Sequence, residues 1–235
     1  MKVRSLLSHA LLLGAGVLLA TSAQATILTF DLDPGVPNFG DIPGSYGDNV
    51  NAASDAVGSY LVGNGYTPNV ATDYRTWQIS TDTVAYNNLD FWATGYGDLT
   101  NVAYSVTSSD HFAEITFVPE PGWAIRLNSF DMAGYNVTDH LNSQVRILDG
   151  TSNTILVDYS PVTILGAGGT HSTFTPGLTH EGPLSIRFGY NDWNVGIDNI
   201  NFDQVAVVPE PETYAMLLAG LGLVGFMARR RKQNA

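Results

Sequence analysis

The sequence predicts an all-β protein in which two antiparallel sheets pack face to face as a β-sandwich. Its middle part consists of short runs of alternating apolar and polar residues separated by Gly, Pro, Asn and Asp, a pattern typical of short strands joined by turns. No long stretch has the spacing of an amphipathic helix. In the run 184–190 every second residue is apolar, so one face of this strand should be buried and the other wet.

The clearest expected strands follow one another along the whole middle part of the chain. They are residues 27–31, 76–79, 102–106, 113–117, 125–132, 144–149, 154–159, 184–190 and 195–207. The alternation breaks in the last of them, because Ile197 and Ile200 are three residues apart. A β-bulge at Asp198 and Asn199 would restore the phase and turn these polar groups outward.

The N-terminus predicts a cleaved secretory signal peptide that covers residues 1–25. Lys2 and Arg4 precede an apolar run at 11–19, which should be helical, and Ala23 and Ala25 place small side chains at the −3 and −1 positions of a cleavage site. The expected partners of this segment are the Sec translocon and signal peptidase. The alternative is a short N-terminal helix of a cytosolic protein, but residues 6–20 lack the polar face that it would need.

The C-terminus has three parts in a fixed order. They are Pro209, Glu210 and Pro211, then the apolar run 214–228, then Arg229, Arg230 and Arg231. As a helix the apolar run spans roughly 22 Å, short of the roughly 30 Å hydrocarbon core, and snorkelling arginines would make up the difference. Basic flanks stay cytoplasmic, so the domain in front of this transmembrane helix faces away from the cytoplasm.

This order of tripeptide, short hydrophobic helix and basic cluster resembles the PEP-CTERM sorting signals of Gram-negative bacteria. The resemblance implies recognition by a membrane-embedded exosortase and removal of the helix near residues 209–211. The protein would be anchored transiently in the inner membrane and then reach the cell surface or the medium. Proteins with this tail are typically linked to extracellular polysaccharide and biofilm. The alternative is an ordinary single-span tail anchor. The chain therefore divides into a signal peptide (1–25), a β-sandwich domain (26–208) and a sorting tail (209–235).

A second Pro-Glu-Pro at residues 119–121 is followed by an alternating, strand-like segment that cannot enter a bilayer. Proline fixes φ and Gly122 allows a positive φ, so we expect a turn between two strands. From the sequence this copy has no role in sorting.

The charge of the domain excludes several functions. Residues 26–208 contain 20 acidic residues, four arginines and no lysine, a net charge of −16. Such a surface repels phosphate backbones, so no nucleic-acid partner is expected. The chain also has no cysteine, which excludes disulfides and thiolate zinc sites. Divalent cations and neutral molecules are more suitable partners for this acidic surface than polyanions.

The segment 195–202 is similar to the closing strand of carbohydrate-binding-module-like jelly rolls, and the segment 28–33 looks like their first strand. The resemblance implies that the first and last strands lie side by side and that a structural Ca²⁺ binds where Asp31, Asp33 and Asp198 meet. Ca²⁺ needs six to eight oxygen ligands, which these side chains, backbone carbonyls and water would supply. The alternative is that the three side chains serve only the bulge and a turn.

Tryptophans offer candidate sugar-stacking positions, and sandwich cores use the same residue type. Trp193, in the turn-like segment 191–194, is the best candidate, with core or rim packing as the alternative. The histidines lack metal-binding spacing, and Ser, Asp and His within 108–111 do not make a triad by adjacency alone. No catalytic residue is assigned. We expect a non-enzymatic exported protein of the surface or polysaccharide matrix; the alternatives are a lectin-like module with a defined glycan site and, third, a secreted hydrolase.

Overall fold

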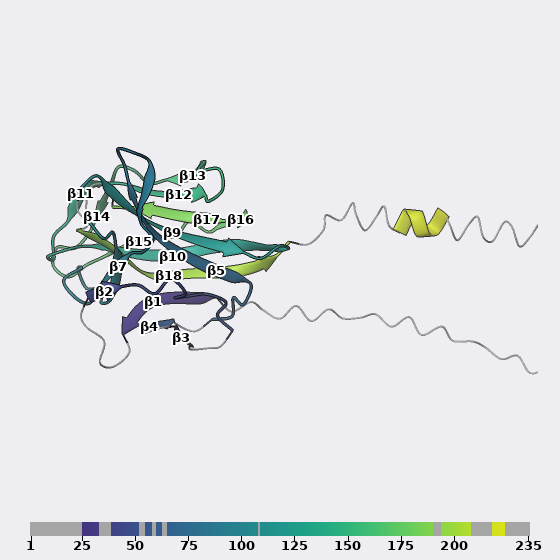
Figure 1. Cartoon of the computed structure of the whole chain (residues 1–235), viewed down its shortest axis with the longest axis horizontal. Coiled ribbons are helices and arrows are strands. Elements are labelled where there is room, and N and C mark those ends of the chain that lie inside the picture. The colour runs from purple at the N-terminus through teal and green to yellow at the C-terminus, as the bar shows by residue number, and fades with distance from the viewer. Residues whose placement is uncertain are drawn as a thin grey trace, which may run out of the picture.

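The computed structural model describes residues 25–32, 39–51, 55–57, 60–62, 65–107, 109–189, 194–207 and 218–223. Within these residues the chain forms two large antiparallel sheets and a small two-stranded one (Figure 1). The antiparallel all-β class expected from the sequence is therefore confirmed.

The larger sheet is built around two long strands that pair along their whole length. These are β10 (Trp123–Gly134) and β18 (Val195–Ala206). On the other edge of β18 lie β1 (Thr26–Leu32) and β8 (Val102–Tyr104). Next to β1 follow β4 (Tyr60–Val62) and β3 (Asp55–Val57). Next to β8 follow β7 (Asp90–Trp92) and β2 (Phe39–Asp41). The free edge of β10 carries β15 (Ser172–Phe174) and β16 (Leu178–Glu181).

The smaller main sheet has six strands. In order they are β13 (Ile155–Asp158), β12 (Val145–Asp149), β17 (Leu184–Phe188), β9 (His111–Pro119), β5 (Val70–Gln78) and β6 (Thr83–Tyr86). The two-stranded sheet pairs β11 (His140–Ser143) with β14 (Val162–Ile164). Throughout β9, β5 and β17 the register runs without a shift, so side chains on neighbouring strands form straight rows.

One hydrophobic core fills the space between the two main sheets. Phe117 of β9 meets Phe202 of β18 with ring centroids 4.6 Å apart, and Phe30 of β1 lies edge-on to Tyr74 of β5 at 6.5 Å. All four side chains are almost completely buried and belong to the same cluster. Because strands of both sheets contribute to one core, the architecture is a β-sandwich.

The expected bulge in the last strand is present. Asn199 has a positive φ of 50°, and the pairing of β10 with β18 shifts between Ser129 and Asp131. The bulge restores the phase, since Ile197 and Ile200 are both completely buried. It does not carry Asp198 into solvent, however, because this side chain is only 4% exposed.

Both ends of the domain lie at the same end of the sandwich. β1 and β18 pair antiparallel, with Thr26 opposite Phe202, as expected for first and last strands that lie side by side (Figure 1). Beyond the domain the structure describes one short helical segment, residues 218–223. Among the described residues no helix is long and apolar enough to cross a membrane. The predicted segments at 11–19 and, apart from 218–223, at 214–228 lie outside the described residues.

Candidate functional site

A row of charged side chains crosses the outer face of the six-stranded sheet. In β5 the side chains of Tyr74 and Thr76 are buried, so the alternating residues Asp73, Arg75 and Trp77 lie on the opposite face. The row itself consists of cross-strand partners in register on five strands: Arg75, Glu114, Arg187, Arg146 and Asp158. It contains three of the four arginines between residues 26 and 208.

The centre of the row is a buried ion pair. The Nε of Arg187 donates to Oε2 of Glu114, and its Nη2 donates to Oδ1 of Asn153 at 2.5 Å. Trp77 Nε1 donates to the other oxygen of Glu114 at 3.1 Å. The guanidinium also lies 5.0 Å from the ring of Trp77 and 4.9 Å from the ring of Phe112. Each charge therefore has its partners, which is the condition under which a buried pair holds a fixed geometry.

A groove of about 270 Å³ opens beside this ion pair. It is lined by Asp73, Arg75, Trp77, Glu114, Thr116, Val118, Gly150, Asn153 and Pro183. At its rim the half-exposed Arg75 and Asp73 form an ion pair of 2.5 Å. Thr116 bonds to Ser185 of the neighbouring strand at 2.7 Å, so part of the floor is fixed as well.

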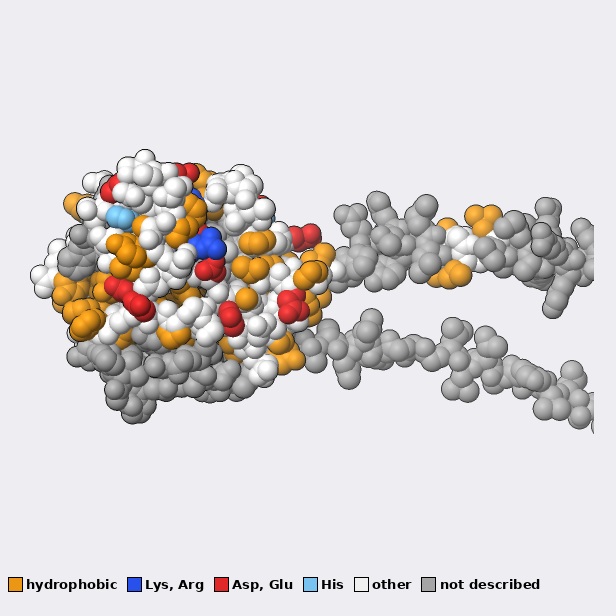
Figure 2. Space-filling view, viewed as in Figure 1, with side chains coloured by type: hydrophobic (Ala, Val, Ile, Leu, Met, Phe, Trp, Pro, Cys, Tyr) orange, Lys and Arg blue, Asp and Glu red, His pale blue; other side chains and the backbone are white. Residues whose placement is uncertain are grey.

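The charges of this face cancel. Arg75 pairs with Asp73, Arg187 with Glu114, and Arg146 with Asp158 at 3.2 Å. In a domain with a net charge of −16 this face is locally neutral, which suits a neutral ligand that offers many hydroxyl groups. Figure 2 shows how sparse basic side chains are on the face of the domain that it displays.

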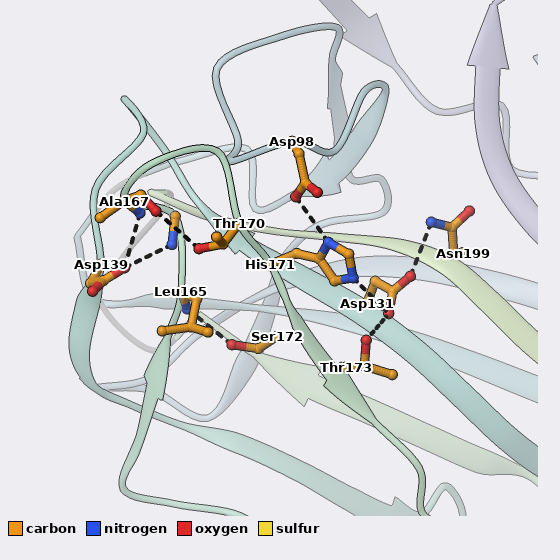
Figure 3. Close-up of polar contacts among 11 residues, drawn as sticks. Asp98, Asp131, Asp139, Leu165, Ala167, Thr170, His171, Ser172, Thr173 and Asn199 are labelled. Atoms are coloured by element: carbon orange, nitrogen blue, oxygen red, sulfur yellow. Dashed lines mark hydrogen bonds and ion pairs between the residues drawn. The ribbon is translucent and has the colours of Figure 1, made fainter.

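A second polar cluster joins loops near the middle of the larger sheet (Figure 3). His171 Nδ1 lies 2.9 Å from Asp98 and its Nε2 3.8 Å from Asp131. Asp131 also accepts from Thr173 Oγ1 at 2.7 Å and from Asn199 Nδ2 at 3.1 Å. The hydrogen bond from His171 lowers the pKa of Asp98. Because Asp131 is already surrounded by donors, this cluster fastens the His171 loop and the bulge of β18 to β10.

The same view shows a carboxylate that holds a turn. Asp139 Oδ1 accepts from the backbone N–H groups of Gly166 and Ala167, both at 2.9 Å, and these bonds lower its pKa (Figure 3). Thr170 Oγ1 donates to the carbonyl of Ala167 at 3.0 Å. The contacts of Asp139 are therefore those of a side chain that satisfies backbone groups.

Of the predicted calcium trio, the structure brings two members near each other. Asp31 accepts from Asn101 Nδ2 at 3.0 Å, and its charge, with that of Asp131, acts on Asp198. Burial is the main cause that raises the pKa of Asp198 to about 8, against the hydrogen bond from the N–H of Asn199. Asp33 lies outside the described residues, and within those residues no group of three acidic or histidine side chains is placed to hold a metal. The calcium site stays a prediction.

Most other residues assigned from the sequence also lie outside the described residues. These are Ala23, Trp193, Pro209, Glu210, Pro211, Arg229, Arg230 and Arg231. Ala25 is described and directly precedes β1. In the stretch 108–111, Asp110 accepts from the side chain and the N–H of Ser80, and His111 Nδ1 lies against the carbonyl of Ser109. Ser108 lies outside the described residues.

Sequence reasoning missed the groove. From the sequence, Trp77 was one of several tryptophans that could stack on a sugar, and Arg75 was one of the four arginines in the charge count. Glu114 and Asn153 were given no role. One signal was available: in 73–77 and in 112–116 the alternate residues that are charged or aromatic share one face. That the two segments pair with each other, and with Arg187, is not visible along the chain.

Comparison with known proteins confirms the sorting signal. Residues 207–232 match the model of the PEP-CTERM protein-sorting motif. The chain therefore carries this motif, which implies export, anchoring of the C-terminus in the membrane and processing by an exosortase. No curated protein matches the chain.

Several solved structures are similar at low identity. One, described as "CBM4 structure and function", shares 12% identity over 56% of this chain and 86% of that one, with a TM-score of 0.29. A second is Caldicellulosiruptor saccharolyticus CBM27-1 in complex with mannohexaose, at 12% identity, 77% and 97% coverage and a TM-score of 0.30. A third is the family 11 carbohydrate-binding module of Clostridium thermocellum in complex with a mixed-linked tetrasaccharide. It shares 12% identity over 78% of this chain and 97% of that one, with a TM-score of 0.25. At these TM-scores the similarity carries no argument about a ligand.

Proposed function

We propose that this protein is a non-enzymatic surface or matrix protein that binds a neutral polysaccharide in the groove on the six-stranded sheet. The observation that carries the proposal is the open groove beside the row of charges. The indole of Trp77, the amide of Asn153 and the charged side chains of Asp73, Arg75 and Glu114 line it. This arrangement favours a defined glycan site over loose association with the matrix.

The chemistry of the groove suits a sugar. A pyranose ring has an apolar face that packs on an aromatic ring, and its hydroxyls both donate and accept hydrogen bonds. Trp77 supplies the ring, while Arg75, Asp73, Asn153 and Thr116 supply donors and acceptors. The volume of about 270 Å³ lies at the small end of ligand sites, so a short stretch of a longer glycan would fill it.

The groove is organised before any ligand binds. Glu114 and Arg187 are buried, and the hydrogen bonds to Trp77 and Asn153 fix the side chains on either side of them. A ligand then does not have to order these groups, which lowers the entropic cost of binding. The C-terminal motif implies export, and release at the cell surface, which is part of this proposal, would bring the groove next to extracellular polysaccharide.

Affinity electrophoresis of the secreted protein tests the proposal. The gels contain a neutral β-glucan, a neutral mannan or, as the acidic comparison, alginate. We expect retardation in a neutral gel and none in alginate, because the acidic domain repels a polyanion. The double variant Asp73→Ala/Arg75→Ala should bind at least about tenfold more weakly, a loss of ~1.4 kcal/mol.

Arg126→Ala is the matched control, because Arg126 is exposed on β10 of the other sheet. It removes one arginine without touching the groove and should leave retardation unchanged. Equal retardation of the double variant and the wild type, or retardation only in alginate, would contradict the proposal.

A further inference from the structure

The internal Pro-Glu-Pro segment at 119–121 lies at the end of the domain where the described part of the last strand ends, two residues before the C-terminal copy begins in the sequence. The N–H of Val207 donates to the carbonyl of Gly122 at 2.9 Å, and Ala206 pairs with Trp123. Gly122 follows the internal copy directly, and residue 207 is the first of the matched sorting motif. The turn at 119–121 therefore lies beside the point where the sorting tail leaves the fold.

The end of β18 is held firmly at this point. Glu120 donates its N–H to the carbonyl of Asn69 at 2.8 Å and accepts from the N–H of Trp123 at 3.0 Å. The N–H of Asn69 donates to Oε1 of Gln204 at 2.8 Å, and Gln204 is buried. These bonds hold the last described residues of β18 against the turn at 119–122.

A pocket of about 300 Å³ opens at the same place. Its lining is formed by Pro119, Glu120, Pro121, Gly122, Trp123, Glu181, Gly182 and Val207. The indole, the prolines and the valine are apolar, while the glutamates are exposed. Figure 2 shows hydrophobic and acidic side chains together where the tail leaves the domain.

The length of chain between the pocket and the tripeptide is very short. Pro209 is two residues and Pro211 four residues beyond Val207, so a fully extended chain takes them at most roughly 7 Å and 14 Å away. A folded protein that binds Pro209 to Pro211 is wider than this length of chain. It must therefore contact the end of the domain that carries the pocket.

We propose that this pocket is a docking surface for the exosortase that reads the tail. The enzyme would insert an apolar side chain between Trp123 and the prolines and place basic groups against Glu120 and Glu181. The tail itself is the poorer occupant, because Glu210 and Glu212 would then approach two further carboxylates. The proposal rests on the sorting motif and is independent of the glycan groove.

Charge reversal of the rim tests it in the full-length protein, expressed with its exosortase. For Glu120→Lys/Glu181→Lys we expect a several-fold larger membrane-bound full-length fraction and less released protein on immunoblots. The matched control is Asp41→Lys/Asp82→Lys, which makes the same charge change at exposed residues that do not line the pocket. The control should be released normally, and all variants should melt like the wild type in detergent.

If the lysine variant melts lower, Glu120→Gln/Glu181→Gln replaces it, and a partial loss of release is then expected. Normal release of a correctly folded rim variant would overturn the proposal, as would an equal defect in the control.

A linker insertion separates docking from simple crowding. About twelve Gly and Ser residues between Val207 and Val208 add a coil of roughly 20 Å and lower the effective concentration of the tripeptide at the docked enzyme. Docking predicts slower release, and the rim variant should then add little further effect. Unchanged or faster release would show that the domain is a bystander or an obstacle.

Discussion

Two carboxylates outside the hydrophobic core are equally buried but have opposite surroundings. Glu114 and Asp198 are each 4% exposed. Glu114 on the six-stranded sheet meets the guanidinium of Arg187 and the indole N–H of Trp77. Asp198 on the larger sheet accepts from the N–H of Asn199 and is repelled by Asp31 and Asp131. The Glu114 site is complete, because its charge is paired with a cation. The Asp198 site is incomplete: ionisation of Asp198 lowers the stability of the fold, and a proton or a bound cation would remove this cost.

Breaking the complete site should have the largest effect on stability. Arg187→Met leaves Glu114 buried without its cation, and we expect it to lower the free energy of unfolding by about 3–5 kcal/mol. Urea denaturation of the secreted protein at pH 7 measures this. The double variant Arg187→Met/Glu114→Gln should recover much of the loss, because no unpaired charge remains. A loss below about 1 kcal/mol in the single variant would contradict the assigned burial of the pair.

The incomplete site should make stability depend on pH. The pKa of Asp198 is about 8 in the fold against 3.8 as its ordinary value. Between these values the folded protein keeps a proton that the unfolded chain releases, so stability falls as the pH rises from about 4 to about 8 and then levels off. The slope is at most about 1.4 kcal/mol per pH unit for one group.

Asp198→Asn should remove that slope and stabilise the protein at pH 8 by about 1–3 kcal/mol, the cost of an incompletely paired buried polar group. Melts in EDTA between pH 4 and 9 compare the two proteins without divalent cations. Asp48→Asn is the control, since Asp48 accepts hydrogen bonds from Thr72, is only partly buried and is not among the charges that act on Asp198. A wild type with the same pH slope as Asp198→Asn would refute the argument.

Calcium should stabilise the same region if the trio predicted from the sequence forms. A ligand that binds only the native state adds about 1.4 kcal/mol when its free concentration is about ten times Kd. We expect Ca²⁺ to raise the melting temperature of the wild type at pH 7 and to leave Asp198→Ala unmoved. Asp33→Ala should likewise lose the rise in melting temperature that Ca²⁺ causes. The site is absent if saturating Ca²⁺ does not shift the wild-type transition.

The comparison also shows what could be predicted from the sequence. Every strand expected from alternation overlaps an observed one, because four or more alternating residues define a face. The missed strands, among them β2, β7, β15 and β16, have three or four residues, too few for a period to be visible. The turn at 119–122 was predicted because Gly122, with φ of 89°, leaves a local signal.

The site residues were harder to predict, since their partners are distant in the chain. Glu114 and Arg187 are 73 residues apart and meet only through the register of β9 with β17. A sequence shows that Glu114 lies in a strand; it does not show which strand lies next to it. Asp198 was noticed because the bulge disturbs a local pattern, but its burial depends on distant segments.

The smallest effect is expected where the row of charges reaches the edge of the sheet. Arg146 and Asp158 form an ion pair of 3.2 Å, and their side chains are 27% and 37% exposed, so water screens the attraction. Arg146→Met should therefore change the free energy of unfolding by about 0.2–1 kcal/mol, the usual range for exposed pairs. The effect should shrink further in 1 M salt, whereas the loss in Arg187→Met should persist because salt does not reach a buried charge. Urea denaturation of both variants at low and high salt makes this measurement. Equal losses at Arg146 and Arg187 would mean that burial does not distinguish the two pairs, and the contrast drawn between a buried and an exposed partner would be wrong.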